Sequence, residues 1–140
     1  RLIFAKPMVL DKHLARHKMA DLFLDTFPYT AHTTCSDALW AGLPVLTRTG
    51  ESFASRVSAS LLNAIGLSEL ATHTNKEYED MAIELANNPI RLKEIKNKLA
   101  KNKLEKPLFN TKLFTKHIES AYTEMHKKYI KNKKPNHIEI

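Results

Sequence analysis

Short apolar runs alternate with helix-periodic segments through the first half of the chain, and this alternation restricts the fold more than any other feature. The runs Leu2–Ala5, Leu22–Leu24 and Pro44–Thr47 are too short for helices and are followed by polar or turn-forming residues. Strands of this length separated by helices are typical of a parallel sheet with crossover helices. The sequence therefore predicts an α/β domain in which Leu2–Ala5 is a buried strand and Ser68–Thr72 supplies a fourth short one.

Helices are predicted between these runs. They extend from a cap at Asp11 to about Ala20, from about Thr34 to Ala41, and from about Ser52 to Ile65. The last two stop at Gly42 and Gly66, because glycine readily adopts the left-handed conformation that ends a helix. From Asn75 onward the apolar spacing is helical throughout, with Asn110 as the cap of a final helix.

The chain of 140 residues suits one domain rather than two. We expect that domain over residues 1–130, with a frayed basic tail over 131–140. The chain opens on an apolar run without an initiating Met, so we expect the domain to be incomplete at its N-terminus. The single cysteine, Cys35, cannot form an internal disulfide, which fits a reducing, cytoplasmic compartment. No run of about 18 apolar residues predicts a membrane span.

The formal charge of +7 is concentrated in two places. Basic residues crowd residues 91–106 and 127–134, and the apolar residues among them keep helical spacing. We interpret both segments as solvated helix faces. The alternative is a basic α/β binding module for nucleic acid or an acidic protein partner. Specific RNA recognition is not favoured, because the lysines are not interleaved with aromatic residues for base stacking.

Ligands of open parallel sheets bind beyond the carboxyl ends of the strands. The loops to inspect are therefore 6–12, 26–36 and 48–52. In the second loop, His32, Thr33 and Thr34 follow a strand and open a helix, where unpaired amides and a partial positive charge attract phosphate. Asp37, one turn on, is placed to accept from a ribose hydroxyl. A capping box of Thr34 and Asp37 explains the same spacing, and the two interpretations are compatible.

Other candidate groups have weaker patterns. His13 and His17 have the spacing of two metal ligands on a helix, but no third ligand is evident and a solvent-facing or pocket-lining pair is favoured. Arg16 lies three residues after His13, so both side chains can reach one pocket. Cys35 lacks a clear activating base, so we expect a small helix-start residue and not a nucleophile. Core packing is the expected role of Trp40.

The same residues stand in the order found in O-linked N-acetylglucosamine transferases, which the chain resembles. The matching segments are Leu24-Asp25-Thr26, His32-Thr33-Thr34, Asp37 to Val45, Gly50 to Val57 and Pro107 to Thr111. The resemblance runs from Arg1 to about His137. It is strongest to bacterial members that carry tetratricopeptide repeats before the catalytic region, a group that also resembles the plant SPINDLY proteins.

In that family the catalytic region has a GT-B fold of two Rossmann-like halves, and this chain resembles the C-terminal half, which holds the nucleotide-sugar donor. The resemblance implies a donor site of Met8, His13, Arg16, His32, Thr33, Thr34 and Asp37. The three residues at the helix start would contact the diphosphate, and Asp37 would hold the ribose. His13 would pack against the base, with Arg16 and the backbone near Met8 reading its edge. Leu10 stands where animal members have a lysine near the ribose, and Lys12 or Lys6 is a candidate replacement.

The resemblance also implies what the rest of the enzyme supplies. The other Rossmann-like half, tetratricopeptide repeats that present the acceptor, and further basic residues would lie before Arg1. The family inverts the transferred sugar without a metal or other cofactor, so no catalytic residue is expected here. The implied reaction moves a sugar, most simply from UDP-GlcNAc, to Ser or Thr of a protein acceptor, with neither nucleic acid nor membrane as partner. The base stays open because SPINDLY-like relatives use guanosine-linked fucose. We expect this chain alone to be inactive.

Overall fold

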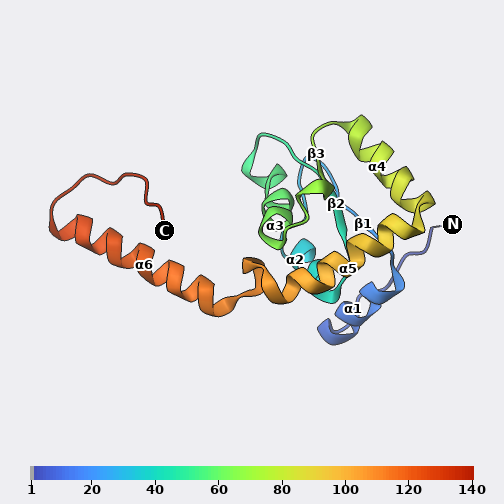
Figure 1. The fold of residues 1–140 in the computed structure, drawn as a ribbon, viewed down its shortest axis with the longest axis horizontal. Coiled ribbons are helices and arrows are strands. Elements are labelled where there is room, and N and C mark those ends of the chain that lie inside the picture. The colour runs from blue at the N-terminus through green and yellow to red at the C-terminus, as the bar shows by residue number, and fades with distance from the viewer. Residues whose placement is uncertain (1) are drawn as a thin grey trace. The chain divides into compact units, whose positions relative to one another are not determined.

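In the computed structural model, which describes residues 2–140, the first part of the chain folds around a small parallel sheet (Figure 1). Its strands are β1 (Phe23–Leu24), β2 (Val45–Arg48) and β3 (Ala71–Thr72), in that spatial order. Leu24 lies opposite Leu46 in the first pair of strands, and Thr47 lies opposite Ala71 in the second. All three carboxyl ends therefore meet at one edge of the sheet, as the predicted α/β architecture requires.

Helices connect and cover the strands. The α-helices are α1 (Leu10–Arg16), α2 (Thr33–Ala41), α3 (Val57–Ile65), α4 (Asn75–Asn87), α5 (Pro89–Glu105) and α6 (Thr111–Ile130). The 3₁₀ helices are η1 (His17–Met19), η2 (Phe53–Ser55), η3 (Ser68–Leu70) and η4 (Pro107–Phe109). None of the helices within residues 2–140 is long and apolar enough to cross a bilayer.

The middle strand, β2, is the centre of the core. Its residues Val45 and Leu46 are fully buried, and α2, α3 and α4 all contact it. Figure 1 shows α3 and α4 on opposite sides of the strands. The helix α5 contacts α3 and α4 and buries Ile95 and Leu99. Burying one leucine side chain contributes about 1.5–3 kcal/mol, so this strand and its helices supply much of the stability.

The chain divides into two compact units, one ending at Leu108 and one covering Phe109–Ile140. The second unit consists of α6 and the segment 131–140, which lies outside any helix. Asn110 caps α6 as predicted, because its side-chain oxygen accepts the amide of Leu113 at 3.0 Å. The glycine stops are also confirmed: Gly42 and Gly66 follow α2 and α3 with φ of 89° and 73°.

The predicted strand at Leu2–Ala5 is wrong. Residues 2–9 adopt no regular structure, and Leu2, Ile3 and Phe4 are 86–94% exposed. An apolar run becomes a strand only where a neighbouring strand takes its backbone hydrogen bonds, and none within residues 2–140 lies beside this one. The predicted strand Ser68–Thr72 is shortened for a local reason, since its first three residues form η3.

Two predicted helices differ in their ends. Asp11 does not cap α1, because the cap position is Val9, which makes no side-chain hydrogen bond there. Asp11 lies in the first turn, where its negative charge interacts favourably with the helix dipole. The helix then tightens into η1 and ends at Met19. The predicted helix Ser52–Ile65 is divided in two, because Ser52 caps only the short η2 and Arg56, with φ of −114°, separates η2 from α3.

Trp40 does not pack in the core as predicted. It is 54% exposed, because α2 turns Cys35, Ala38 and Leu39 toward the sheet and Trp40 projects away from them. The ammonium of Lys103 on α5 lies 5.1 Å from the centroid of its ring. The indole therefore covers the surface beside α5.

Candidate functional site

The loop after β1 is fastened to the sheet by the carboxylate of Asp25. One carboxylate oxygen accepts the amides of Thr26 and Ala31, each at 2.8 Å, and the other accepts the hydroxyl of Thr47 at 2.7 Å. The backbone carbonyl of Asp25 accepts the Tyr78 hydroxyl of α4 at 2.9 Å. One side chain thus ties both ends of the loop to β2, and its own backbone is held by α4.

The far side of this loop is fastened to the segment that leads into α3. The amide and the hydroxyl of Thr30 both donate to the carbonyl of Ala54, at 3.0 and 2.7 Å. The hydroxyl of Ser58 donates to the carbonyl of Ala31, which directly precedes His32, the cap of α2. These bonds leave little freedom in the approach to the helix.

The first turn of α2 presents donors to solvent. The cap residue is His32, whose carbonyl accepts the amides of Cys35 and Ser36, both at 3.1 Å. Thr33 and Thr34 are exposed, and across residues 2–140 no protein acceptor takes their amides or hydroxyls. The predicted capping box is therefore wrong, because Thr34 lies within the helix. What remains is a helix N-terminus with two amides and two hydroxyls available to an anion.

These donors close one side of a pocket of about 380 Å³ at the carboxyl end of β1. Its lining includes Asp25 and Tyr29 as well as the predicted residues His32, Thr33 and Thr34. The rings of Tyr29 and His32 stack with centroids 4.8 Å apart. A ring nitrogen of His32 lies 3.3 Å from the carbonyl oxygen of Ala54, which fixes the imidazole at the pocket wall.

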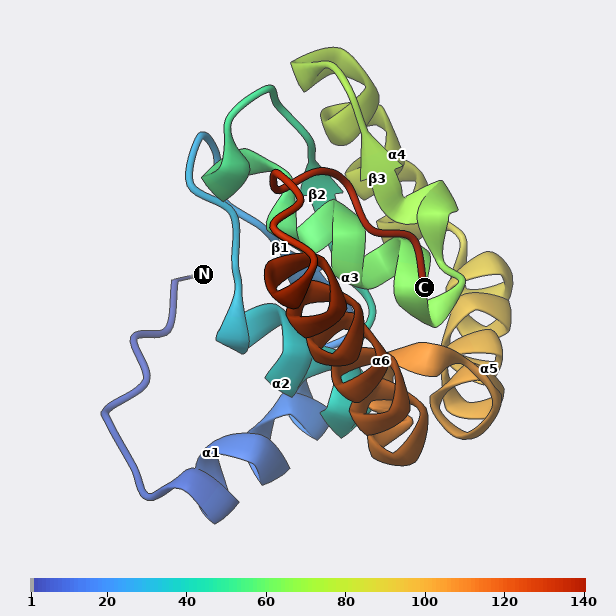
Figure 2. The same ribbon diagram turned by 90° about the vertical axis from the view of Figure 1, so that its left-hand side faces the viewer.

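The remaining predicted residues do not line this pocket. Asp37 is half-buried and lies three and four residues after the threonines, on the same face of the helix. Met8, His13 and Arg16 belong to α1 or the segment before it, and α1 lies against α2 (Figure 2). Arg16 donates to the carbonyl of Lys6 at 3.1 Å. The structure therefore brings α1, with His13 and Arg16, against α2, which carries Asp37, and places Met8 in the irregular segment before α1.

The two histidines of the possible metal pair contact each other. Nδ1 of His17 lies 2.9 Å from the carbonyl oxygen of His13, and the rings meet edge to face. Within the described part of the chain, no group of three or more His, Cys, Asp or Glu side chains is arranged to hold a metal ion.

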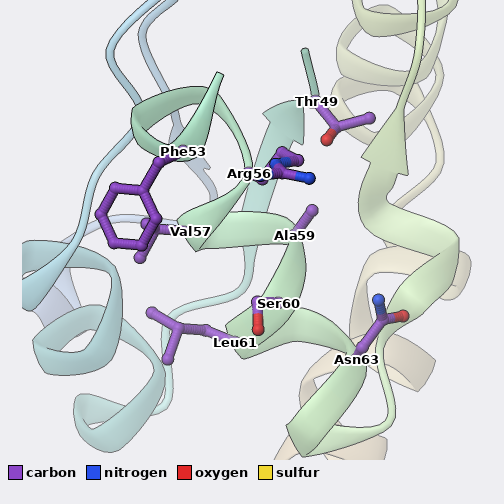
Figure 3. Close-up of a pocket in the computed structure, with 8 residues that line it drawn as sticks. All are labelled: Thr49, Phe53, Arg56, Val57, Ala59, Ser60, Leu61 and Asn63. Carbon is purple, nitrogen blue, oxygen red and sulfur yellow. The ribbon is translucent and has the colours of Figure 1, made fainter. Parts of the chain in front are cut away.

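A second hollow, of about 560 Å³, lies along the outer face of α3. Figure 3 shows Phe53, Val57 and Leu61 on one side of this hollow, with Arg56 and Asn63 among the other lining residues. None of the predicted donor residues lines it. It is therefore separate from the pocket at α2.

The thiol of Cys35 is expected to be unreactive in the folded chain. Its side chain is fully buried behind the first turn of α2, and this burial raises the pKa of the thiol to about 12. We therefore expect a thiol-disulfide reagent to modify the native chain very slowly at pH 8, because only a trace of thiolate forms. The control is the same protein in denaturant, which should react within minutes. Equally fast labelling of the native chain would contradict the buried position of Cys35.

Sequence reasoning missed the residues that hold the loop. Asp25 stands out in the sequence only within the segment Leu24-Asp25-Thr26 that matches the family, and no role at the site is predicted for Ser58 or Tyr78. A weak signal was present for Asp25, since an acidic residue directly after a buried strand often binds the loop that follows. Its partners Thr47 and Tyr78 lie 22 and 53 residues away along the chain, so no local pattern marks them.

An open parallel sheet with a donor-rich helix N-terminus at its carboxyl edge is the arrangement found in phosphate- and nucleotide-binding α/β domains. The family model described as glycosyl transferase family 41 matches residues 1–118. The chain belongs to that family.

Curated relatives match along most of the chain. A probable UDP-N-acetylglucosamine–peptide N-acetylglucosaminyltransferase SEC from Arabidopsis thaliana is 34% identical over all of this chain and 14% of its own length. The UDP-N-acetylglucosamine–peptide N-acetylglucosaminyltransferase of Caenorhabditis elegans is 33% identical over 99% of this chain and 12% of its own. The chain therefore spans only about an eighth to a seventh of the length of these relatives.

A solved structure has the same fold. An O-GlcNAc transferase mutant of Thermobaculum terrenum superposes with a TM-score of 0.80 at 36% identity, covering 85% of this chain and 23% of that one. This likeness confirms the predicted fold class, a Rossmann-like C-terminal half of a GT-B glycosyltransferase with a parallel sheet, flanking helices and a helical C-terminus.

Proposed function

We propose that this chain is the donor-binding half of an inverting glycosyltransferase that moves a sugar from a nucleotide sugar, UDP-GlcNAc in the simplest case, to Ser or Thr of proteins. The observation that carries the proposal is the exposed first turn of α2, where Thr33 and Thr34 offer amides and hydroxyls to an anion. Membership of glycosyl transferase family 41 supports it, as do the peptide N-acetylglucosaminyltransferases among the relatives.

In this proposal the diphosphate lies against His32, Thr33 and Thr34, and the nucleoside extends along α2 toward α1. Asp37 holds the ribose, and His13 packs on the base while Arg16 and the backbone near Met8 read its edge. As the sugar–phosphate bond breaks, negative charge develops on the departing diphosphate. Fixed amides and hydroxyls stabilise that charge without reorganisation, and so supply the electrostatic stabilisation that a metal ion provides in other enzymes.

The proposal assigns the remaining parts of the reaction to other segments of a longer protein. The opposing Rossmann-like half and tetratricopeptide repeats are those segments, and the acceptor is a separate protein. We place the enzyme in the cytoplasm, since the one cysteine of this chain is a free thiol. The isolated chain is expected to bind donor without transferring the sugar.

The basic-module alternative is not favoured. Several lysines of α5 form ion pairs within the first unit, including Lys96 with Asp21 at 2.6 Å and Lys98 with Glu69 at 2.6 Å. Such pairs reduce the positive field that a polyanion would meet.

Replacement of the ribose contact tests the proposal. In the full-length protein we expect Asp37→Ala to raise the donor KM by roughly 10- to 150-fold, because a hydrogen bond to a charged group contributes about 1.5–3 kcal/mol. Steady-state transfer assays with UDP- and GDP-sugars measure the effect and identify the base. Asp80→Ala on α4, where the exposed carboxylate pairs only with Lys76, is the matched control. Unchanged donor kinetics in Asp37→Ala would count against the proposed site.

A further inference from the structure

The carboxylate of Asp25 lies in the wall of the pocket that the proposed diphosphate enters. A free carboxylate at that place would repel a diphosphate. Asp25 is instead only 8% exposed, and both of its oxygens are occupied by donors of the protein. Its side chain therefore acts on the loop and not on a ligand.

Two of the three bonds to this carboxylate come from the two ends of the pocket loop. Thr26, the first residue of the loop, and Ala31, the last, donate their amides to the same oxygen at 2.8 Å. Ala31 directly precedes His32, the cap of α2. The carboxylate thus fixes the backbone one residue before the turn that carries the exposed threonines.

The carboxylate is itself held by elements distant in sequence. Thr47 of β2 donates its hydroxyl to the second oxygen, and Tyr78 of α4 donates to the backbone carbonyl of Asp25. β2 is the most buried strand, so the loop takes its position from the centre of the fold. The guanidinium of Arg48, at the end of the same strand, lies 3.9 Å from the ring centroid of Phe27 and supports the outer part of the loop.

We infer that Asp25 is a positioning residue for the donor diphosphate, which it never touches: it presets the loop so that the first turn of α2 faces the pocket before donor binds. This inference rests on the proposed function. Hydrogen-bond donors that are already in position stabilise charge more effectively than donors that must reorganise. The entropy of ordering them has already been lost when the protein folds.

A pair of matched threonine variants separates positioning from plain stability. Thr47 and Thr72 are both buried strand residues, and each donates its hydroxyl across the sheet, Thr47 to Asp25 at 2.7 Å and Thr72 to the carbonyl of Thr47 at 3.0 Å. Thr47→Val removes a bond to the carboxylate, whereas Thr72→Val removes a similar bond that does not reach the loop. Both variants are expected to lower the melting temperature.

The test measures donor KM, acceptor KM and melting temperature of the full-length enzyme. We expect Asp25→Ala to raise the donor KM at least about tenfold, and Thr47→Val to raise it several-fold, with the acceptor KM unchanged in both. Thr72→Val should keep the wild-type donor KM. Asp25→Asn should recover most of the donor affinity, because its amide oxygen still accepts both loop amides and its amide nitrogen can donate to the Thr47 hydroxyl.

Two results would overturn the positioning role. One is a wild-type donor KM in Thr47→Val and Asp25→Ala; the other is an equal rise in donor KM in Thr47→Val and Thr72→Val. The double variant Thr33→Val/Thr34→Val, measured beside them, separates this failure from failure of the proposed function. If the double variant raises the donor KM while the Asp25 series does not, only the positioning role fails. If the double variant leaves the donor KM unchanged, the proposed diphosphate site itself fails. Should Asp25→Ala not fold, Thr47→Val decides.

Discussion

Replacing both threonines of the first turn of α2 should nearly abolish sugar transfer by the full-length enzyme. Thr33→Val/Thr34→Val keeps the shape of each side chain but removes two hydroxyl donors to the diphosphate. Hydrogen bonds to charged groups contribute about 1.5–3 kcal/mol each, so we expect kcat/KM for the donor to fall roughly 100- to 10,000-fold. Because charge grows on the leaving group in the transition state, kcat should fall as well as donor affinity.

The matched control is Thr115→Val/Thr123→Val in α6. There each hydroxyl donates to the backbone carbonyl four residues earlier, at 2.9 and 2.8 Å, and the substitution is the same double loss of a hydroxyl on an exposed helix face. Radiolabelled sugar transfer to a protein acceptor measures both pairs. Equal activity of the two double variants would show that the first turn of α2 does not bind the donor.

The largest effect on stability is expected in the central strand. Leu46 is fully buried in β2, between the helices that contact both sides of the sheet. Truncation to alanine leaves a cavity that the surrounding side chains fill only in part. We expect Leu46→Ala to lower the free energy of unfolding by about 2–5 kcal/mol, a large fraction of the stability of a domain of this size.

Urea denaturation of the purified chain, followed by circular dichroism, measures this loss. Leu104→Ala in α5 provides the control, because Leu104 is 89% exposed and its truncation should change the free energy of unfolding by no more than about 0.5 kcal/mol. A Leu46→Ala midpoint equal to that of Leu104→Ala would mean that β2 is not the centre of the core.

Local patterns predicted the parts of the fold that depend on neighbouring residues. The glycine stops after α2 and α3, the cap at Asn110 and the short strands at Leu24 and Val45 all followed from spacing and turn chemistry. The strand predicted at Leu2–Ala5 failed because an apolar run indicates a tendency to be buried but not the presence of a partner strand.

For the candidate site, too, the sequence predicted only those features that depend on neighbouring residues. The helix-start pattern correctly brought His32, Thr33 and Thr34 together in one pocket, because the helix dipole and unpaired amides are local properties. The cap was placed two residues late, at Thr34, because the true start at His32 is set by the loop geometry. That geometry depends on the contacts of Asp25 with distant β2 and α4, which no local spacing reveals.

The central claim is that the first turn of α2 binds the diphosphate of a nucleotide sugar. Calorimetric titration of the full-length protein with UDP, GDP and pyrophosphate tests it most directly, in the wild type, Asp37→Ala and Thr33→Val/Thr34→Val. We expect saturable binding with a preference for one nucleotide. Asp37→Ala should weaken nucleotide binding and spare pyrophosphate, whereas the double threonine variant should weaken all three. If each of the three ligands binds both variants with the same affinity as it binds the wild type, the claim is contradicted.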